Sequence, residues 1–151
     1  HSSMYGGRQF PSFDQGWVSW FCYQALEQKK QSLVTPFTIA GNGKQVRDLL
    51  HGDDIVRLYY AIIDKKELTA GGAFNIGGGY NASLSLLELF ALLESITGKK
   101  LAYEKLTPRA SDQKVFIADC SKVEQLFRWT PQIDSRTGVQ QMCDWIQKNL
   151  L

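Results

Sequence analysis

The chain has 151 residues, of which 44% are hydrophobic and 21% charged, and its formal net charge is +2. This length suits one domain, since a chain of about 150 residues buries roughly 70% of its unfolded surface. The composition lies far from disordered or polybasic sequences and argues against a nucleic-acid partner. No apolar run is long enough to span a bilayer and no cleavable signal precedes the first residues, so we expect a soluble, cytoplasmic protein without a membrane partner.

The cysteines and histidines give no sign of a disulfide framework or a metal site. Cys22, Cys120 and Cys143 are widely spaced and form no C-x-x-C pair, so each is expected to be a buried thiol. His1 and His51 have no acids or cysteines at ligand spacing, and we therefore predict no metal centre.

The first half of the chain predicts a helix, a hairpin and a second helix. Apolar residues recur at helical spacing within residues 16–30. Residues 37–40 and 44–50 are then expected to be two strands of a hairpin, because Asn42-Gly43 between them favours a type I′ turn. A helix follows from about Gly52, with Ile55, Leu58, Tyr59 and Ile62 on one side and acidic Asp53 and Asp54 near its start.

The second half alternates strands with helices. Residues 72–79 are expected to be a short buried strand, and Ser85 and Glu88 form a capping box for a helix that ends at Gly98. Residues 100–106 and 113–119 predict further strands, Asp119 is expected to cap a short helix, and residues 136–149 predict the last one. Apart from the hairpin, this alternation indicates an α/β fold.

Arg47 and Arg109 are the two cations most suited to an anionic ligand. Strand alternation places Gln45 and Arg47 on the face opposite Val46 and Asp48. A guanidinium offers a planar fork that matches phosphate, although a surface salt bridge is the simpler interpretation of Arg47. Arg109 lies in the loop "TPRASDQ", where it is equally compatible with a solvated charge.

Three successive glycines, residues 77–79, follow a predicted strand and raise the alternative of a phosphate cradle. The G-x-G-x-x-G spacing is absent, so a tight turn is the preferred interpretation. The chain has no G-x-S-x-G elbow, and a hydrolase triad has no support.

Several motifs together resemble one family over the whole chain. "YGGRQF", "DQGW", "GNGKQVRDLLHGDD", "FNIGGGYNASLSLLELF" and "PRASDQKVFIAD" occur in the order found in the extended short-chain dehydrogenase/reductase family of NAD-dependent epimerases and dehydratases. The chain looks most similar to the branch of CDP-paratose 2-epimerases, because "DQGW" follows "G-x-R-Q". The "VRD" and "R-x-x-D" motifs are specific to enzymes that act on nucleotide sugars.

The resemblance implies roles for individual residues. It implies that Arg47 and Arg109 bind the diphosphate of a nucleotide sugar, and that the strand at 37–40 lines the base. The further residues implied are Ser2 and Met4 beside the cofactor, Ser3 beside the sugar, Thr38, Ile39 and Ala40 along the base, and Gln15 and Trp17 on the substrate side. No catalytic residue and no metal ligand are implied within this chain.

The family's glycine-rich NAD loop and its Tyr-x-x-x-Lys pair, which lie upstream in relatives, have no counterpart here. The resemblance therefore implies a C-terminal half: a substrate-binding lobe with the last helix (16–30) and strand (72–79) of a doubly wound Rossmann-like sheet. The N-terminal NAD-binding part would be missing. An unpaired sheet edge and a bare helix face predict a homo-oligomer when the chain is isolated.

The implied function is part of an NAD-dependent epimerase that inverts C2 of a CDP-linked dideoxyhexose through transient oxidation. The isolated chain is expected neither to be active nor to bind NAD. Two alternative functions are also compatible with the sequence. One is the corresponding lobe of a nucleotide-sugar 4,6-dehydratase or 4-epimerase, and the other is a non-catalytic binding or scaffold module.

Overall fold

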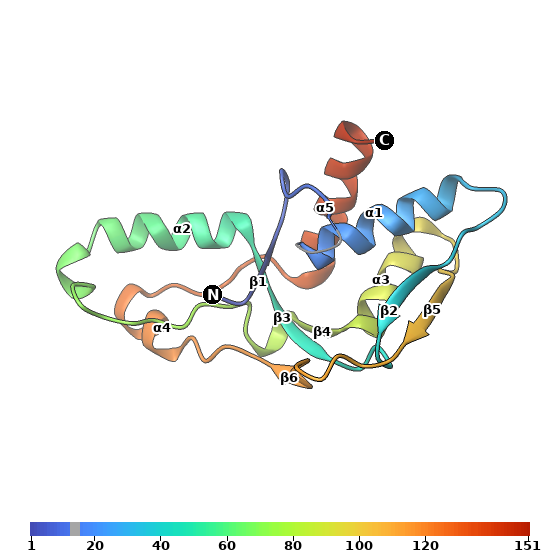
Figure 1. Cartoon of the computed structure of the whole chain (residues 1–151). Coiled ribbons are helices and arrows are strands. Elements are labelled where there is room, and N and C mark those ends of the chain that lie inside the picture. Colours follow the sequence, from blue (N-terminus) through green and yellow to red (C-terminus); the bar gives the residue numbers. More distant parts are fainter. Residues whose placement is uncertain (13–15) are drawn as a thin grey trace.

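The computed structural model describes residues 1–12 and 16–151, which form an α/β fold with parallel strand pairs, as the sequence predicted (Figure 1). The strands are β1 (Ser3–Tyr5), β2 (Phe37–Ala40), β3 (Val46–His51), β4 (Ser83–Ser85), β5 (Tyr103–Leu106) and β6 (Val115–Phe116). The helices are α1 (Trp17–Lys30), α2 (Gly52–Ile63), α3 (Leu86–Thr97), α4 (Ser121–Phe127) and α5 (Ser135–Asn149), with short 3-10 turns η1 (Lys66–Leu68) and η2 (Tyr80–Ala82).

Strand β3 is the central strand of the larger sheet. It pairs in parallel with β1 and with β6, and antiparallel with β4. A separate two-stranded sheet joins β2 and β5 in parallel, with Thr38 opposite Glu104 and Ala40 opposite Leu106. In Figure 1 this smaller sheet lies on the side of α1 and α3, whereas α2 and α4 extend to the opposite side of β3.

Two hydrophobic cores lie on either side of β1 and β3, as the two-residue repeat of a strand requires. Tyr5 and Leu49 belong to the larger core, and the adjacent Met4 and Leu50 pack in the smaller one. The larger core is formed mainly by α1, α3 and α5, and the smaller one by α2 and α4.

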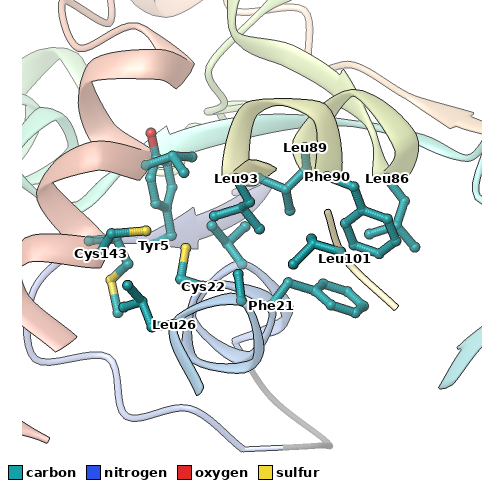
Figure 2. Packing of buried hydrophobic residues seen from close by; sticks show 14 of the residues in the cluster. Tyr5, Phe21, Cys22, Leu26, Leu86, Leu89, Phe90, Leu93, Leu101 and Cys143 are labelled. Carbon is teal, nitrogen blue, oxygen red and sulfur yellow. The ribbon is translucent and has the colours of Figure 1, made fainter. Parts of the chain in front are cut away.

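Helix α1 supplies the centre of the larger core. Phe21, Cys22 and Leu26 point between α3 and α5 (Figure 2), and the fully buried Cys22 and Cys143 belong to the same cluster. The apolar residues that recur at helical spacing in this helix are all buried, namely Val18, Phe21, Cys22, Ala25 and Leu26. Helical periodicity therefore predicted this element and its orientation.

The helix ends follow the predicted local chemistry. Ser85 Oγ accepts the Glu88 N–H at 3.2 Å while Glu88 accepts the Ser85 N–H, so the capping box of α3 is confirmed. These bonds from Ser85 lower the pKa of Glu88. Gly98 ends α3 in the left-handed conformation with φ at 71°.

The predicted hairpin between β2 and β3 is wrong, because these strands belong to different sheets. A type I′ turn requires positive φ at both central residues. Here Gly41 and Gly43 have positive φ, and Asn42 instead accepts the Lys44 N–H through its side chain at 3.0 Å. The Asn-Gly pair thus forms a local turn that sends β3 away from β2.

Three smaller expectations also need correction. No strand forms over residues 72–79, although Ile76 O accepts the Ser2 N–H at 2.8 Å and the segment runs beside β1. The N-cap of α4 is Cys120 rather than Asp119, whose side chain accepts from Ser121. Tyr59, assigned to the inner face of α2, is exposed.

In the described part of the chain, no helix combines the length and the apolar composition that crossing a bilayer requires.

Candidate functional site

A pocket of about 310 Å³ opens where the start of α1, strand β2, the first residues of β3 and the loop after β5 meet. It is lined by Gly16, Trp17, Trp20, Phe21, Thr38, Ile39, Ala40, Gln45, Arg47, Leu86, Arg109 and Asp112. Six of the predicted ligand-binding residues are in this set, so the fold brings together residues that are distant in the sequence.

Arg47 reaches the pocket because of its place in β3. The following residue, Asp48, is fully buried on the other face, which confirms the predicted alternation. The Arg47 guanidinium donates through Nη1 to its neighbour's carbonyl, Val46 O, at 2.8 Å. One end of the fork is thereby fixed, and the remaining donors are available to a ligand.

Arg109 enters the pocket from the exposed loop between β5 and β6. The Asp112 N–H donates to Arg109 O at 3.2 Å, so a turn places the two side chains at the same pocket. Among residues 1–12 and 16–151, neither Arg47 nor Arg109 forms an ion pair. Two such cations on one pocket favour a ligand with closely spaced negative charges.

Strand β2 forms another wall of the pocket. Ile39 is buried in the larger core, Thr38 is exposed, and Gly41 N continues the ladder by donating to Leu106 O at 3.0 Å. The Gln45 side chain crosses from β3 and donates to Ala40 O at 2.9 Å. The wall is therefore held on both sides by hydrogen bonds.

The first turn of α1 contributes indole rings to the pocket. Trp17 and Trp20 both line it, and the Trp17 Nε1–H donates to Ser3 Oγ at 3.2 Å. Ser3 does not line the pocket itself but contacts a residue that does. Gln15, the other residue predicted on the substrate side, lies outside the described residues.

Helix α1 is fastened to the small sheet by the buried Gln28, which sequence reasoning missed. Its Nε2 donates to Thr35 O at 2.9 Å and to Ala102 O at 2.8 Å, and its Oε1 accepts the Ala102 N–H at 3.0 Å. These bonds hold the chain just before β2 and β5 against α1, and so fix the walls of the pocket relative to one another.

The residues expected beside a dinucleotide lie elsewhere. Ser2 and Met4 are on or next to β1, and Met4 packs in the smaller core. The glycine run offers no phosphate cradle, because a Cβ at Gly77 would overlap the Asp48 carboxylate and one at Gly78 would overlap Leu49 O. These glycines allow the chain to lie directly against β3.

Sequence reasoning gave no ligand role to several lining residues, notably Trp20, Gln45 and Asp112. The sequence spacing could have identified two of them. Trp20 lies three residues after Trp17 on the helix, and Asp112 lies three residues after Arg109 in the loop. Gln45 had no such signal, because its side-chain bond to Ala40 O reaches across a turn whose geometry the sequence did not predict.

A second hollow, of about 500 Å³, adjoins the first between the turn at 41–45 and the loop at 108–115. It shares Gln45, Arg109 and Asp112 with the first, so the two together form one extended surface. No cluster of metal-ligating side chains was found in the described ranges.

A family model described as "NAD dependent epimerase/dehydratase family" matches residues 1–77, just over half of the chain. The chain belongs to this family. The resemblance inferred from the sequence motifs is thereby confirmed, and so is the assignment of the fold to the Rossmann-type epimerases.

Curated relatives from two branches of the family match the chain. The CDP-paratose 2-epimerase of Salmonella typhi is 51% identical over 145 residues, which cover 96% of this chain and 43% of that protein. The UDP-glucuronate 4-epimerase of Thermodesulfobacterium geofontis is 34% identical over 115 residues, covering 76% of this chain and 34% of its own length. The chain thus spans less than half of the length of these relatives.

Solved structures of family members share the fold. UDP-glucose 4-epimerase from Thermotoga maritima, with UDP-glucose, superposes with a TM-score of 0.80 at 28% identity, covering 99% of this chain and 45% of that one. UDP-glucuronic acid 4-epimerase from Bacillus cereus, in complex with UDP-glucuronic acid and NAD, gives 0.82 at 28% identity, covering 97% and 43%.

Proposed function

We propose that the pocket between α1, β2 and the Arg109 loop binds the nucleoside diphosphate of a nucleotide sugar, with Arg47 and Arg109 on the diphosphate. The observation that carries this proposal is the convergence of these two arginines on one pocket, with neither in an ion pair in the described residues. Ile39 and Ala40 would border the base, and Trp17 with Ser3 the sugar side.

We further propose that the chain is the C-terminal part of a longer NAD-dependent epimerase that inverts C2 of a CDP-linked dideoxyhexose by transient oxidation. Support comes from the 51% identity to a CDP-paratose 2-epimerase and from the chain's covering 43% of that relative. Helix α1 and the segment 72–79, which runs beside β1, would belong to its doubly wound domain. The three free cysteines suit a reducing compartment such as the cytoplasm.

The residues of this chain would bind the nucleotide sugar and take no part in a step of catalysis. The sequence given contains neither a G-x-G-x-x-G loop nor a Tyr-x-x-x-Lys pair, so NAD is expected to bind the full-length protein and not the isolated chain. A clear NAD titration signal from the isolated chain would contradict this division.

The outer face of helix α2 carries exposed apolar side chains that another part of a longer protein could cover. Val56, Tyr59, Tyr60 and Ile63 are exposed and form one stripe at helical spacing, while Ile55 and Leu58 on the other face are buried. We propose that the N-terminal half of the full-length protein covers this stripe, and that the isolated chain self-associates through it.

Arginine substitutions test the binding proposal directly. Arg47→Ala and Arg109→Ala should each weaken the binding of CDP, measured by calorimetry, by about 1.5–3 kcal/mol, the contribution of a charge-assisted hydrogen bond. Arg47→Lys keeps the charge but loses the fork and should recover only part of the affinity. Arg136→Ala, on the exposed first turn of α5, is the matched control.

Unchanged CDP affinity in both alanine variants would refute the diphosphate assignment. The comparison of CDP with UDP and dTDP separates the 2-epimerase from the alternatives, since the family members that match less closely include UDP-sugar 4-epimerases and dTDP-glucose 4,6-dehydratases. Preference for UDP or dTDP would favour those branches.

A further inference from the structure

The loop that carries Arg109 has few contacts of its own. Residues 107–114 are exposed throughout, and the two residues of β6 that follow remain 61% and 38% exposed. Within the described residues, the Val46 N–H donates to Lys114 O at 2.9 Å, and Val46 and Arg47 pair with the two residues of β6. Apolar burial therefore does little to hold this segment beside β3.

Asp48 supplies an additional attachment from the interior. Its side chain is fully buried, and Oδ2 accepts the Ala118 N–H at 3.1 Å and the Gly79 N–H at 3.2 Å. The carboxylate thus joins β3 to the chain just after β6 and to the glycine run. Asp48 follows Arg47 on β3 and points to the opposite face of the strand. The hydrogen bonds of Asp48 therefore lie on the side of β3 away from the pocket that Arg47 faces.

The chemistry of the site calls for an acceptor without a donor. Both neighbours are backbone N–H groups, and a carboxylate offers only acceptor positions. Both N–H groups donate to the same oxygen, Oδ2, so Asn could still accept both through its one oxygen. These bonds would, however, lose the charge of the carboxylate, which makes a hydrogen bond roughly twice as strong. A change at Asp48 therefore loosens the attachment while leaving the shape of the side chain nearly unchanged.

From this arrangement we propose that Asp48 is a positioning residue for nucleotide-sugar binding. It does not touch the ligand, but it holds the segment after the Arg109 loop against β3, so that Arg109 and Arg47 face the same diphosphate. This inference rests on the proposed function of the pocket. Asp48 lies outside the pocket, yet the contribution of Arg109 to the affinity for the nucleotide would depend on it.

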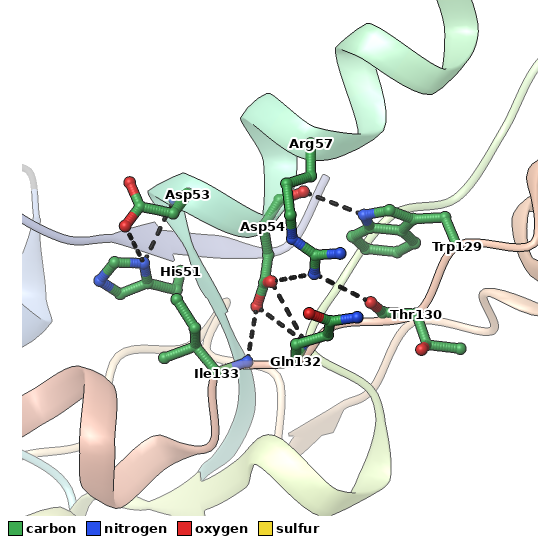
Figure 3. Close-up of polar contacts among 8 residues, drawn as sticks. All are labelled: His51, Asp53, Asp54, Arg57, Trp129, Thr130, Gln132 and Ile133. Atoms are coloured by element: carbon green, nitrogen blue, oxygen red, sulfur yellow. Dashed lines mark hydrogen bonds and ion pairs between the residues drawn. The ribbon is translucent and has the colours of Figure 1, made fainter.

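A second buried carboxylate provides a matched control. Asp54, in the first turn of α2, is also fully buried, and its carboxylate accepts the Gln132 N–H at 3.1 Å and the Ile133 N–H at 3.0 Å (Figure 3). It also pairs with Arg57. Asp54 anchors a remote loop in the same way as Asp48, but that loop carries no lining residue of the pocket.

The test is a double-variant cycle on the full-length protein, with CDP as the probe. Asp48→Asn should weaken CDP binding about tenfold, and the pair Asp48→Asn with Arg109→Ala should bind no more weakly than Arg109→Ala alone. Asp54→Asn should lower the unfolding midpoint without changing CDP affinity. Wild-type affinity in Asp48→Asn, or fully additive losses in the pair, would overturn the proposal.

Amide exchange in the ligand-free protein gives a second readout. Asp48→Asn should accelerate exchange in residues 108–118, and Asp54→Asn should not. If Asp48→Asn does not fold, Ala118→Pro removes one of the two donors instead, and wild-type CDP affinity in that variant overturns the proposal. Were Arg109→Ala itself to bind CDP normally, the proposed function of Arg109 fails, and unchanged exchange in Asp48→Asn separately refutes the role of Asp48.

Discussion

The imidazole of His51 is buried between the ring of Tyr5 and the first turn of α2. Its Nδ1 accepts the Asp53 N–H at 3.2 Å and thereby caps the helix (Figure 3). The Tyr5 and His51 rings meet edge to face at 5.3 Å between centroids. Burial lowers the pKa of His51, although Asp53 and Asp54 nearby act in the opposite direction.

The lowered pKa predicts that stability falls on mild acidification. Between the folded pKa and the unfolded value of about 6.5, the unfolded state binds more protons, so the free energy of unfolding decreases as the pH falls. Protonation would also remove the cap at Nδ1, which is worth about 1 kcal/mol. Urea unfolding from about pH 7.5 to about 5.5 should therefore show a falling midpoint.

His51→Asn is the control, because Asn keeps an oxygen that can cap the helix and does not titrate in this range. Its unfolding midpoint should depend less on pH than that of the wild type. Equal pH dependence in the two proteins would exclude His51 as the source.

At the residue scale, the sequence predicted the residues whose role follows from strand or helix periodicity. Arg47 faces the pocket and Asp48 the interior, as alternation required. Asp54 was expected to serve the helix dipole, yet it is buried and binds a loop near residue 132. Contacts between segments so far apart have no local signature, and the same limit applied to Gln28.

At the element scale, the helices were predicted well and the strand pairing was not. Helix boundaries depend on caps and apolar spacing within the element itself, as in the capping box of α3. Strand pairing depends on partners elsewhere in the chain: β2 pairs with β5 rather than with the neighbouring β3. The segment 72–79 lacks the strand pairing expected of it, although Ile76 O accepts one bond from Ser2.

At Gly138, where α5 packs on β1, helix propensity and side-chain packing predict opposite effects of a substitution by Ala. Helix propensity predicts that Gly138→Ala stabilises α5 by about 1 kcal/mol. A Cβ at this position would, however, overlap the hydroxyl of Tyr5, which is buried in the larger core. Overpacking costs about 1–3 kcal/mol, so the substitution should be destabilising overall.

The free energy of urea unfolding of Gly138→Ala shows whether the gain in helix propensity or the cost of overpacking is larger. Tyr5→Phe removes the hydroxyl, which has no hydrogen-bond partner among the described residues, and the double variant should regain part of the lost stability. If Gly138→Ala is as stable as the wild type or more so, helix propensity outweighs the contact with β1.

At the scale of the whole molecule, the described residues leave an apolar surface on α2, the helix at the left of Figure 1. Ile55 and Leu58 on the inner face of α2 are buried in the smaller core, whereas the stripe of Val56, Tyr59, Tyr60 and Ile63 is exposed. A contiguous stripe of this kind favours association with another surface.

Light scattering of the isolated chain tests whether the stripe associates. The wild-type chain should form dimers or larger species, and Tyr60→Glu with Ile63→Glu should shift it toward the monomer, because charges placed on an apolar contact oppose its burial. Leu33→Glu is the control, since Leu33 is 89% exposed in the loop after α1 and lies outside the stripe. The same pair of substitutions should destabilise the full-length protein if its N-terminal half covers α2. A strictly monomeric wild-type chain would argue against self-association, and unchanged stability of the substituted full-length protein would argue against the covering half.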